Sequence, residues 1–398
     1  MNKAPAVLFV TTSFPRFPGD FAGSFIYRFA RYLVEDGVPV TVLAPAAAAY
    51  PIQETMSGIY VRRFTYFWPP QRQRLAYDGG GILANMRLSW LARLQVPLFF
   101  LALLWRLWRE QDQHQIIHCH WLPTAAAALL TRPFSRTKPP IVFTNWGSDT
   151  RLMPTWLTRW VVQRVEGCIS TAVETDEHLR QAGRDDFRRI MAPVEEERFN
   201  REVVAPDLAQ ELGLTPDVPV IAFVGRLNYF KDPLTFIRAC GRVQEQGVPF
   251  IALVAGDGDL QAECQAEVTR LGLADTVRFL GMRSDPERVL RLAAATVHIS
   301  PIENTWANAI AEAMFMSVPV VLTRVGYTER LFTHERDCLL IPPQDPDALA
   351  SALIRLLTDA GLGQHLATGA WNLLREQKKE KRAIVTAVRA YYDELLRE

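Results

Sequence analysis

The feature of this sequence that most constrains its fold is a repeated pattern. A short run rich in Val, Ile and Ala is followed by a turn rich in Gly, Pro and Asp, and then by an amphipathic stretch. This alternation occurs in both halves of the chain and is typical of α/β proteins with parallel sheets. Because 398 residues exceed what one hydrophobic core usually serves, two domains are expected. The sequence therefore predicts two doubly wound, Rossmann-like domains.

The strand-like runs and the shift in composition between them predict where each domain lies. Acidic residues separate the two halves, together with Pro206, Pro216 and Pro219. We therefore predict an N-terminal domain over 1–195, a second domain over 196–375, and a C-terminal helix over 376–398 that packs back on the first domain. The predicted strands are Ala6–Thr11, Pro39–Ala44, Gln115–Cys119, Pro140–Thr144, Gly167–Ala172, Val220–Val224, Phe250–Ala255, Val277–Leu280, Val297–Ser300 and Val318–Leu322, and the last helices are Asp347–Thr358 and Ala367–Leu396.

Charge, cysteine usage and hydropathy exclude several classes of protein. Lys and Arg number 44 against 43 for Asp and Glu, so no overall field favours a nucleic acid partner. The cysteines are five, an odd number, and contain no CxxC pair, which indicates reduced thiols and a cytoplasmic protein. The N-terminus resembles a first strand and not a signal peptide. The apolar stretch Leu94–Trp105 is 12 residues long, shorter than the roughly 20 that a membrane span requires.

The turn after Val220–Val224 carries the first candidate for chemistry. Gly225 permits a close backbone approach, and Arg226 and Lys231 follow before a helix that begins with Pro233. An arginine fork and a lysine point charge from one loop suit a pyrophosphate. An ordinary solvated loop with incidental charges is the alternative interpretation.

Two further turns of the second half carry weaker signals. Gly256 and Gly258 flank an aspartate after a predicted strand, and glycines there let the chain approach a phosphate or a base, although Gly-Asp-Gly is also a common turn. Asn308 and Glu312 lie one helical turn apart on one face. A carboxylate in that position can accept hydrogen bonds from a ribose diol, whereas a lone surface glutamate is usually only solvated.

Taken together, these turns resemble the donor-binding half of the retaining glycosyltransferases of family 4, also called glycosyl transferases group 1. The resemblance covers most of the chain, and several motifs match in order. It implies the GT-B fold, with two Rossmann-like domains facing a central cleft, and an enzyme of bacterial envelope polysaccharide type. The matching segments are Val224-Gly225-Arg226-Leu227 with Lys231, Gly256-Asp257-Gly258, Val277–Gly281, Glu303 to Met314, Val318–Val321, and Cys338–Pro343 with Asp347–Leu349.

The resemblance also implies a role for each motif. Arg226 and Lys231 would hold the donor diphosphate and stabilise its charge as the glycosidic bond breaks. Glu303 would lie beside the transferred sugar, and Glu312 would hold the ribose. The expected substrate is a UDP- or GDP-sugar, without a metal ion or other cofactor, and retention would come from same-face substitution and not from a covalent enzyme intermediate. The other expected donor contacts are Gly23, Gly225, Gly256, Asn304, Thr305, Trp306 and Asn308.

The sequence departs from the family pattern in this same region. The two glutamates of the family are usually eight positions apart, whereas Glu303 and Glu312 are nine apart, and Asn304 occupies the usual position. The sequence therefore leaves open whether Glu303 or Asn304 takes the role of the first of the family's two glutamates. Thr305 replaces a common glycine, as does Ala307, and Ser317 stands where a glycine usually ends the helix. A catalytically inactive GT-B protein that binds a nucleotide or a partner enzyme is the alternative function.

The first half supplies the candidates for the acceptor side. Trp146 occupies a position where the family often has a histidine, and Asp149 follows as a contact for hydroxyl groups or as a helix cap. His118 and His120 alternate on one strand end and therefore project to the same face. A metal site there would need a third ligand, so His120 is interpreted as an acceptor-pocket residue or as a histidine of the core.

The segment 59–109 is strongly basic and aromatic. It contains eight arginines and one acid, Asp78, a net charge of +7 in a chain whose total is +1. Such a surface would bind anionic lipid headgroups and would place the protein on the inner face of the membrane. A saccharide or a lipid-linked acceptor would then be the second substrate. The alternative is that the apolar positions simply pack a helix against the first sheet, namely Leu88, Leu91, Phe99, Leu103 and Leu107.

Overall fold

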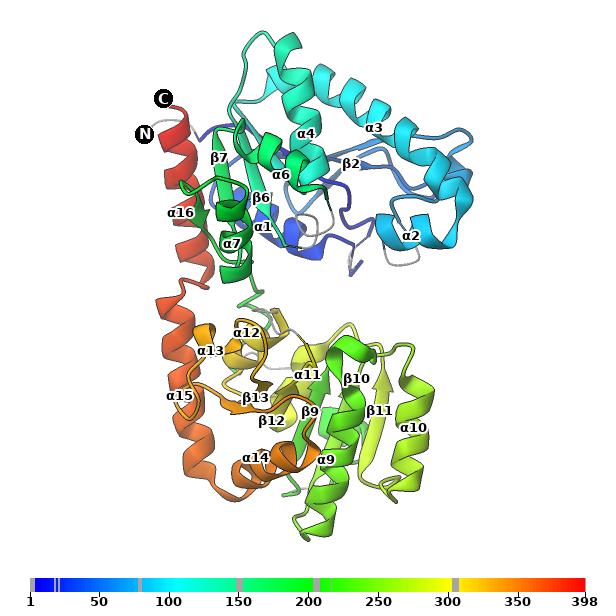
Figure 1. The fold of residues 1–398 in the computed structure, drawn as a ribbon, viewed down its shortest axis with the longest axis vertical. Coiled ribbons are helices and arrows are strands. Elements are labelled where there is room, and N and C mark those ends of the chain that lie inside the picture. Colours follow the sequence, from blue (N-terminus) through cyan, green and yellow to red (C-terminus); the bar gives the residue numbers. More distant parts are fainter. Residues whose placement is uncertain are drawn as a thin grey trace. The chain divides into compact units, whose positions relative to one another are not determined.

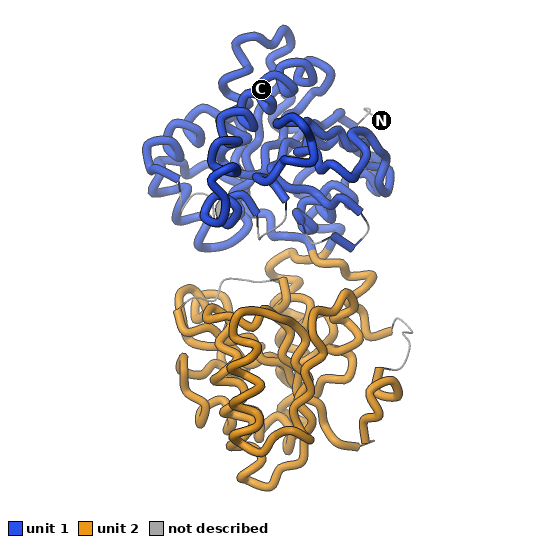
Figure 2. Tube along the Cα trace, turned by 90° about the vertical axis from the view of Figure 1, so that its right-hand side faces the viewer, with its two compact units in different colours: residues 1–193, 381–398 blue, residues 194–380 orange. Residues whose placement is uncertain are grey.

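The protein consists of two compact units, each built around its own sheet (Figures 1 and 2). Unit 1 comprises residues 1–193 and 381–398, and unit 2 comprises residues 194–380. The predicted boundary after residue 195 lies two residues from this division. The computed structural model describes residues 4–397 except for 18, 21, 78–80, 148–152, 203–207, 216 and 303–307.

Unit 1 contains a sheet of eight strands in the order β3-β4-β2-β1-β5-β6-β7-β8. All neighbouring strands are parallel except the pair β3 and β4. Val7 and Phe9 of β1 face one hydrophobic cluster, and Leu8 and Val10 face the other, so both faces are covered. The strands are β1 (Val7–Val10), β2 (Val40–Pro45), β3 (Gln53–Met56), β4 (Ile59–Phe64), β5 (Ile116–His120), β6 (Ile141–Asn145), β7 (Gly167–Ser170) and β8 (Arg188–Arg189).

The helices of unit 1 cover the two faces of this sheet (Figure 1). Helices α3, α4 and α6 contribute to the cluster of Leu8, and α1 and α16 contribute to the cluster of Phe9. Helix α16 comes from the end of the chain, so the C-terminus completes the first unit. The bounds are α1 (Ser24–Glu35), α2 (Ile82–Leu88), α3 (Trp90–Glu110), α4 (Leu122–Thr131), α6 (Thr155–Val162), α7 (Val173–Gln181) and α16 (Lys381–Leu395).

Unit 2 contains a parallel sheet of six strands in the order β11-β10-β9-β12-β13-β14. The order reverses between β9 and β12, which is where doubly wound sheets bind ligands. The strands are β9 (Val220–Val224), β10 (Ile251–Ala255), β11 (Val277–Gly281), β12 (Ala293–His298), β13 (Val320–Thr323) and β14 (Leu339–Ile341). The helices are α8 (Leu208–Glu211), α9 (Pro233–Glu245), α10 (Gln261–Arg270), α11 (Pro286–Leu292), α12 (Asn308–Phe315), α13 (Thr328–Leu331), α14 (Pro346–Thr358) and α15 (Ala360–Glu376).

Two local predictions were wrong, and strand β4 was not predicted. The basic segment after residue 58 begins with strand β4. This strand was missed because the arginines near its end indicated a solvent-exposed surface. The single helix predicted from Ala367 to Leu396 is two helices, α15 and α16, separated where Lys378 has a positive φ of 50°. The apolar stretch Leu94–Trp105 was judged too short to span a membrane, but the helix that contains it extends over Trp90–Gln113 when its final 3-10 turn is included. By length and composition alone it could cross a membrane.

Candidate functional site

In unit 2 the loops after β9 and β10 are joined at the carboxyl end of the sheet. The Gly225 N–H donates to the carbonyl of Ala255 at 3.0 Å, and the Leu227 N–H donates to the carbonyl of Asp257 at 2.8 Å. Gly256 in turn donates to the carbonyl of Gly281 at 2.8 Å. These hydrogen bonds give both loops a defined conformation, so the side chains that they carry are held in place by the sheet.

The glycines of the second loop are required by this junction. A Cβ atom on Gly256 would lie 1.9 Å from the carbonyl oxygen of Gly225, and one on Gly258 would lie 2.3 Å from that of Leu227. From the sequence, both glycines were expected to let the chain approach a phosphate or a base. In the structure the space that they leave open is filled by the neighbouring loop, so their first role is to let the two loops pack.

Arg226 and Lys231, the two predicted diphosphate ligands, have different surroundings. Arg226 is exposed to solvent directly after β9. Lys231 ends a short 3-10 turn, Tyr229–Lys231, and its side chain is partly buried. Asp232 then adopts a left-handed conformation with φ 44°, and Pro233 begins α9. One cation is therefore exposed at the surface, while the other is partly buried.

The partner that holds Lys231 is His298, a residue that sequence reasoning missed. Lys231 Nζ donates to His298 Nε2 over 3.1 Å at the end of β12, the strand next to β9. Burial lowers the pKa of Lys231 to about 8. Burial, together with the charge of Lys231, lowers the pKa of His298 well below its usual value. His298 is therefore neutral at pH 7, with Nε2 as the hydrogen-bond acceptor.

Glu312 lies beside this pair. It extends from α12, and Glu312 and His298 line the same small cavity between β9, β12 and α12. Lys379, at the end of the chain segment that returns to unit 1, is fully buried. That burial lowers the pKa of Lys379 to about 7, and the carboxylate of Glu312 opposes the shift. The structure thus brings Lys231, His298 and Glu312 together at the switch point of the sheet.

The turn that ends α12 contains a serine whose backbone conformation is one that usually requires glycine. Ser317 has φ 53°, in the left-handed region that favours glycine. The N–H of Ser317 donates to the carbonyl of Met314 at 2.9 Å, and the N–H of Val318 donates to that of Ala313 at 3.0 Å. Replacement of the usual glycine therefore leaves the helix end intact at some cost in backbone strain.

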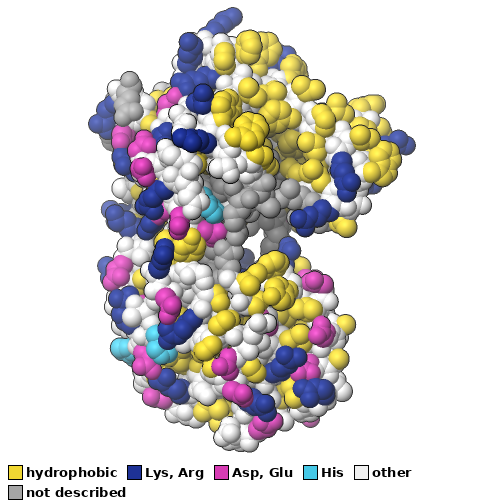
Figure 3. Space-filling model, in the orientation of Figure 1, with side chains coloured by type: hydrophobic (Ala, Val, Ile, Leu, Met, Phe, Trp, Pro, Cys, Tyr) yellow, Lys and Arg dark blue, Asp and Glu magenta, His cyan; other side chains and the backbone are white. Residues whose placement is uncertain are grey.

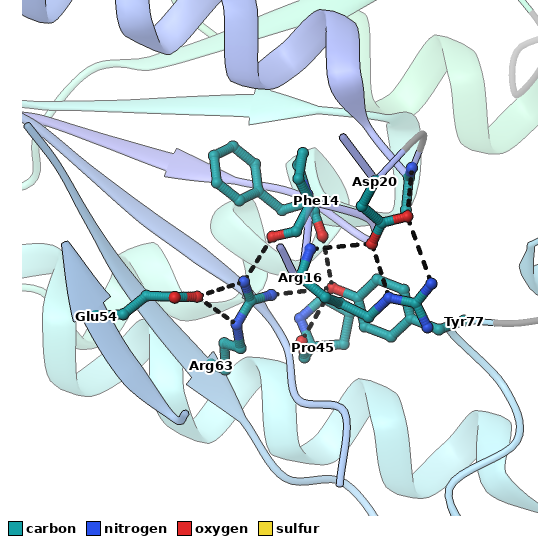
Figure 4. A network of polar contacts seen from close by, with 9 residues as sticks. Phe14, Arg16, Asp20, Pro45, Glu54, Arg63 and Tyr77 are labelled. Atoms are coloured by element: carbon teal, nitrogen blue, oxygen red, sulfur yellow. Dashed lines mark hydrogen bonds and ion pairs between the residues drawn. The ribbon is translucent and has the colours of Figure 1, made fainter. Parts of the chain in front are cut away.

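In unit 1 the loop after β1 is fixed by buried polar contacts (Figure 4). The buried guanidinium of Arg63 donates to the carbonyl of Pro15 at 2.6 Å and to Glu54 at 2.7 Å. The Tyr77 hydroxyl lies 3.1 Å from the carbonyl oxygens of both Phe14 and Pro45. These contacts hold the loop against the ends of β2 and β4.

The same loop contains a second ion pair and the predicted glycine. Burial favours a raised pKa for Asp20, but hydrogen bonds from Arg16 outweigh it and lower the pKa. Gly23 has φ 65°, and a Cβ there would lie 2.4 Å from the carbonyl oxygen of Ser13. A side chain at Gly23 would therefore displace the loop, whether or not a ligand is bound.

The predicted pair of histidines lies on one face of the unit 1 sheet. The rings of His118 and His120 stack with centroids 4.5 Å apart. Both ring nitrogens of His118 are bonded at 2.6 Å, to the hydroxyl groups of Tyr392 on α16 and of Thr144 on β6. Burial lowers the pKa of His118 to about 3. His118 is therefore a structural residue that ties the C-terminal helix to the sheet.

His120 and Trp146 form a pair at the carboxyl end of this sheet. Trp146 Nε1 donates to His120 Nδ1 at 3.3 Å, and the Trp146 ring packs on Phe25 with centroids 4.6 Å apart. Nε2 of the buried His120 has no hydrogen-bond partner within the described part of the chain. Burial, and then the neighbouring His118, lowers the pKa of His120 well below its usual value. Around His120 and Trp146 the described side chains are aromatic and uncharged, whereas the loop after β1 carries the Arg16–Asp20 ion pair.

Several predicted site residues lie outside the described residues. They are Asp149 in unit 1 and Glu303, Asn304, Thr305 and Trp306 in unit 2. Asn308 is described at the start of α12, one turn from Glu312 as predicted. The sequence offered one signal for His298, which is a polar residue at the end of an otherwise apolar strand. It offered none for Lys379, because its burial depends on a helix break.

Comparison with known proteins agrees with this architecture. The sequence profile of the glycosyl transferases group 1 matches residues 218–359, and that of glycosyltransferase family 4 matches residues 22–198. The chain is similar to the 2-deoxystreptamine glucosyltransferase of Streptomyces kanamyceticus, at 27% identity over 84% of this chain and 89% of that protein. It is also similar to the lipopolysaccharide core biosynthesis glycosyltransferase LpsD of Rhizobium meliloti, at 31% identity over 49% of this chain and 55% of that protein.

Other curated relatives match over less of their length, and the match spans 41% and 42% of two of them. Among solved structures, the Anabaena HepE protein in complex with UDP and glucose has a TM-score of 0.72 at 18% identity, over 98% of this chain and all of that one. At that identity the likeness shows the fold alone. The two profiles together extend over both units. The chain therefore belongs to the family 4 glycosyltransferases, also called glycosyl transferases group 1, and has the GT-B fold.

Proposed function

We propose that this protein is a retaining glycosyltransferase that moves a sugar from a nucleotide sugar to an acceptor. The observation that carries the proposal is the cluster of Lys231, His298 and Glu312 at the switch point of the unit 2 sheet. A cation and a carboxylate held there suit the two polar ends of a nucleoside diphosphate, which are the diphosphate and the ribose. The UDP complex of HepE supports a uridine diphosphate sugar as the donor.

In this proposal Arg226 and Lys231 neutralise the diphosphate, and Glu312 accepts hydrogen bonds from the ribose. The oxocarbenium-like transition state leaves negative charge on the departing phosphate, so cations fixed beside it accelerate the reaction. Lys231 is already oriented by His298 before the donor binds, which lowers the cost of ordering it. Retention would follow from attack on the same face, assisted by that phosphate, without a metal ion.

The acceptor is proposed to be a saccharide or a lipid-linked saccharide in polysaccharide or glycolipid biosynthesis. The relationship to LpsD supports an envelope polysaccharide. His120 and Trp146 are the proposed acceptor-side residues, because neutral aromatic groups suit uncharged sugar rings. All five cysteines are buried free thiols, which supports a reducing, cytoplasmic location.

The test is a thermal-shift series with UDP, GDP, ADP and their sugars, followed by product analysis with the nucleotide that stabilises. Ligand at about 100 times its Kd should stabilise the protein by roughly 2.7 kcal/mol. We expect this shift to disappear in Arg226→Ala and Lys231→Ala and to persist in Arg238→Ala, whose guanidinium is bonded to Glu267 on the surface of unit 2. Failure of every nucleotide to stabilise folded protein would contradict the proposal. Binding without transfer to any acceptor would favour an inactive nucleotide-binding subunit.

A further inference from the structure

Helix α3 has two apolar faces, and only one of them is used by the fold. Its inner face consists of Ala92, Phe99, Leu103 and Leu107, all buried in the core of unit 1. Its outer face contains six large apolar side chains whose exposed fractions lie between 43% and 72%. These outer side chains, named here the outer stripe, are Trp90, Leu94, Leu98, Leu101, Trp105 and Trp108.

The outer stripe is continuous. Successive members lie three or four residues apart, so they align along one side of the helix over about 27 Å. Figure 3 shows hydrophobic side chains gathered over this part of unit 1, with basic side chains among them. An exposed apolar surface of this length is uncommon on a soluble protein and indicates a binding surface.

The charge around the outer stripe indicates which kind of partner it binds. Residues 81–109 contain four arginines and no acidic residue. Arg106 is paired with the buried Glu110, whereas the exposed Arg87, Arg93 and Arg109 leave the surface of α2 and α3 positively charged. The Arg109 guanidinium lies over the ring of Trp105, 5.3 Å from its centroid, so a cation borders the apolar surface. Tryptophan, leucine and arginine in this arrangement match the boundary between anionic headgroups and acyl chains.

The inner face determines how the helix would meet a bilayer. Gln95 is fully buried, and its side chain accepts from the Arg74 N–H at 2.8 Å and donates to the carbonyl of Arg72 at 2.7 Å. Glu110 is buried in contact with Arg62. A helix that crossed the bilayer would lose these polar contacts and the packing of its inner face. The helix therefore remains in unit 1 and only its outer stripe is available to lipid.

We propose that α3 is an in-plane membrane-binding helix that inserts its outer stripe into the headgroup region of an anionic bilayer. This sharpens the sequence hypothesis of a basic surface over 59–109. Arg62 and Arg63, which counted toward that surface, face the interior, where they contact Glu110 and Glu54. A second copy of the chain is a poorer partner for the stripe, because a symmetric interface would bring the arginines of both copies together.

The test is flotation of the full chain with vesicles of phosphatidylcholine, with and without phosphatidylglycerol. We expect strong binding to the anionic vesicles. Leu94→Gln/Leu101→Gln should weaken it roughly tenfold or more, because both leucines would bury their exposed area in lipid. The matched control is Met282→Gln/Trp371→Gln, which removes two exposed apolar side chains from unit 2 and should bind as the parent does.

The contribution of charge is measured in the same assay. Arg87→Gln/Arg109→Gln should lose most of the preference for phosphatidylglycerol while retaining weak binding to neutral vesicles, because the outer stripe is unchanged. Equal binding by the parent and by Leu94→Gln/Leu101→Gln would overturn the proposal, and so would failure of the parent to bind anionic vesicles. A circular dichroism spectrum and an unfolding midpoint like those of the parent show that unit 1 of each variant is folded. Neither this control nor flotation requires nucleotide, so the result is independent of the proposed transfer reaction.

Two further outcomes would assign the stripe to another role. A parent dimer that Leu94→Gln/Leu101→Gln converts to a monomer in size-exclusion chromatography, without vesicle binding, would identify a second copy as the partner. Vesicle-bound protein that resists extraction by alkaline carbonate would indicate a spanning helix. We expect a monomer in solution and release by carbonate, as for a protein held at the interface.

Discussion

Among the described residues, the ends of β5 and β6 in unit 1 and of β9 and β12 in unit 2 differ in charge, although both units have the same type of fold. In unit 2 these strand ends hold Lys231 and Glu312 around the neutral His298. In unit 1 they hold His120 and Trp146, which are neutral and stacked among aromatic rings. One architecture therefore supplies either a charged or an uncharged site at the ends of its strands, depending on a few side chains. A charged site suits a nucleotide, and a neutral one suits a sugar.

The largest expected effect concerns the cation of unit 2. Lys231→Ala should reduce the rate of sugar transfer by a factor on the order of 10²–10³, because a fixed charge beside the leaving phosphate is lost. It should also weaken nucleotide binding, measured by calorimetry. Trp146→Phe removes the donor to His120 and should slow transfer while leaving nucleotide affinity within about twofold. A similar loss of nucleotide affinity in both variants would contradict the assignment of the nucleotide to unit 2 and of the acceptor to unit 1.

The second effect is a pH dependence of nucleotide binding. The pKa of Lys231 is about 8, so the free protein loses this charge as the pH rises above that value. A bound diphosphate favours the charged form, and affinity should therefore fall by up to about tenfold per pH unit above pH 8. Titrations between pH 7 and pH 9.5 would measure it. Lys231→Arg should abolish this decrease, since arginine stays charged. An unchanged decrease in that variant would exclude Lys231 as its source.

The third effect concerns the stability of unit 1. The folded-state pKa of His118 is about 3, below its usual value of 6.5, so the unfolded chain binds more protons at acidic pH. The stability linked to this residue is present above pH 6.5 and is lost as the pH falls toward 3, by about 1.4 kcal/mol per pH unit. His118→Gln should be less stable at pH 7 but should lose stability less steeply below pH 6.5. Urea unfolding at several pH values would measure both slopes, and equal slopes would contradict the assignment.

The smallest effect concerns the helix end beside Glu312. Ser317→Gly should stabilise unit 2 by about 0.5–1 kcal/mol, because glycine accepts the left-handed conformation at φ 53° without strain. Ser351→Gly, in the interior of α14, is the matched control and should destabilise by a similar amount. Thermal unfolding measures both. Destabilisation by Ser317→Gly would mean that the serine side chain contributes more than its backbone strain costs.

Much of the fold was predictable because it depends on local patterns. The strand Val220–Val224 was predicted to the residue, and the other predicted strands have counterparts shifted by a few residues at most. Strand β4 was missed because Arg62 and Arg63 at its end indicated a solvent-exposed surface. In the structure Arg63 is buried against Pro15 and Glu54, which are distant in sequence. A charge that is neutralised by a distant partner cannot be recognised from local composition.

Local sequence patterns were enough to predict the two doubly wound units, the loop that carries Arg226 and Lys231, and the helix that carries Glu312. Hydropathy period and turn residues specify these features within a short stretch of chain. Three other features depend on tertiary contacts: His298 orients Lys231, Gly256 allows two loops to pack, and α3 keeps one apolar face outside the core. Each of these depends on which side chains meet after the strands have been ordered in the sheet, and no local pattern records that order.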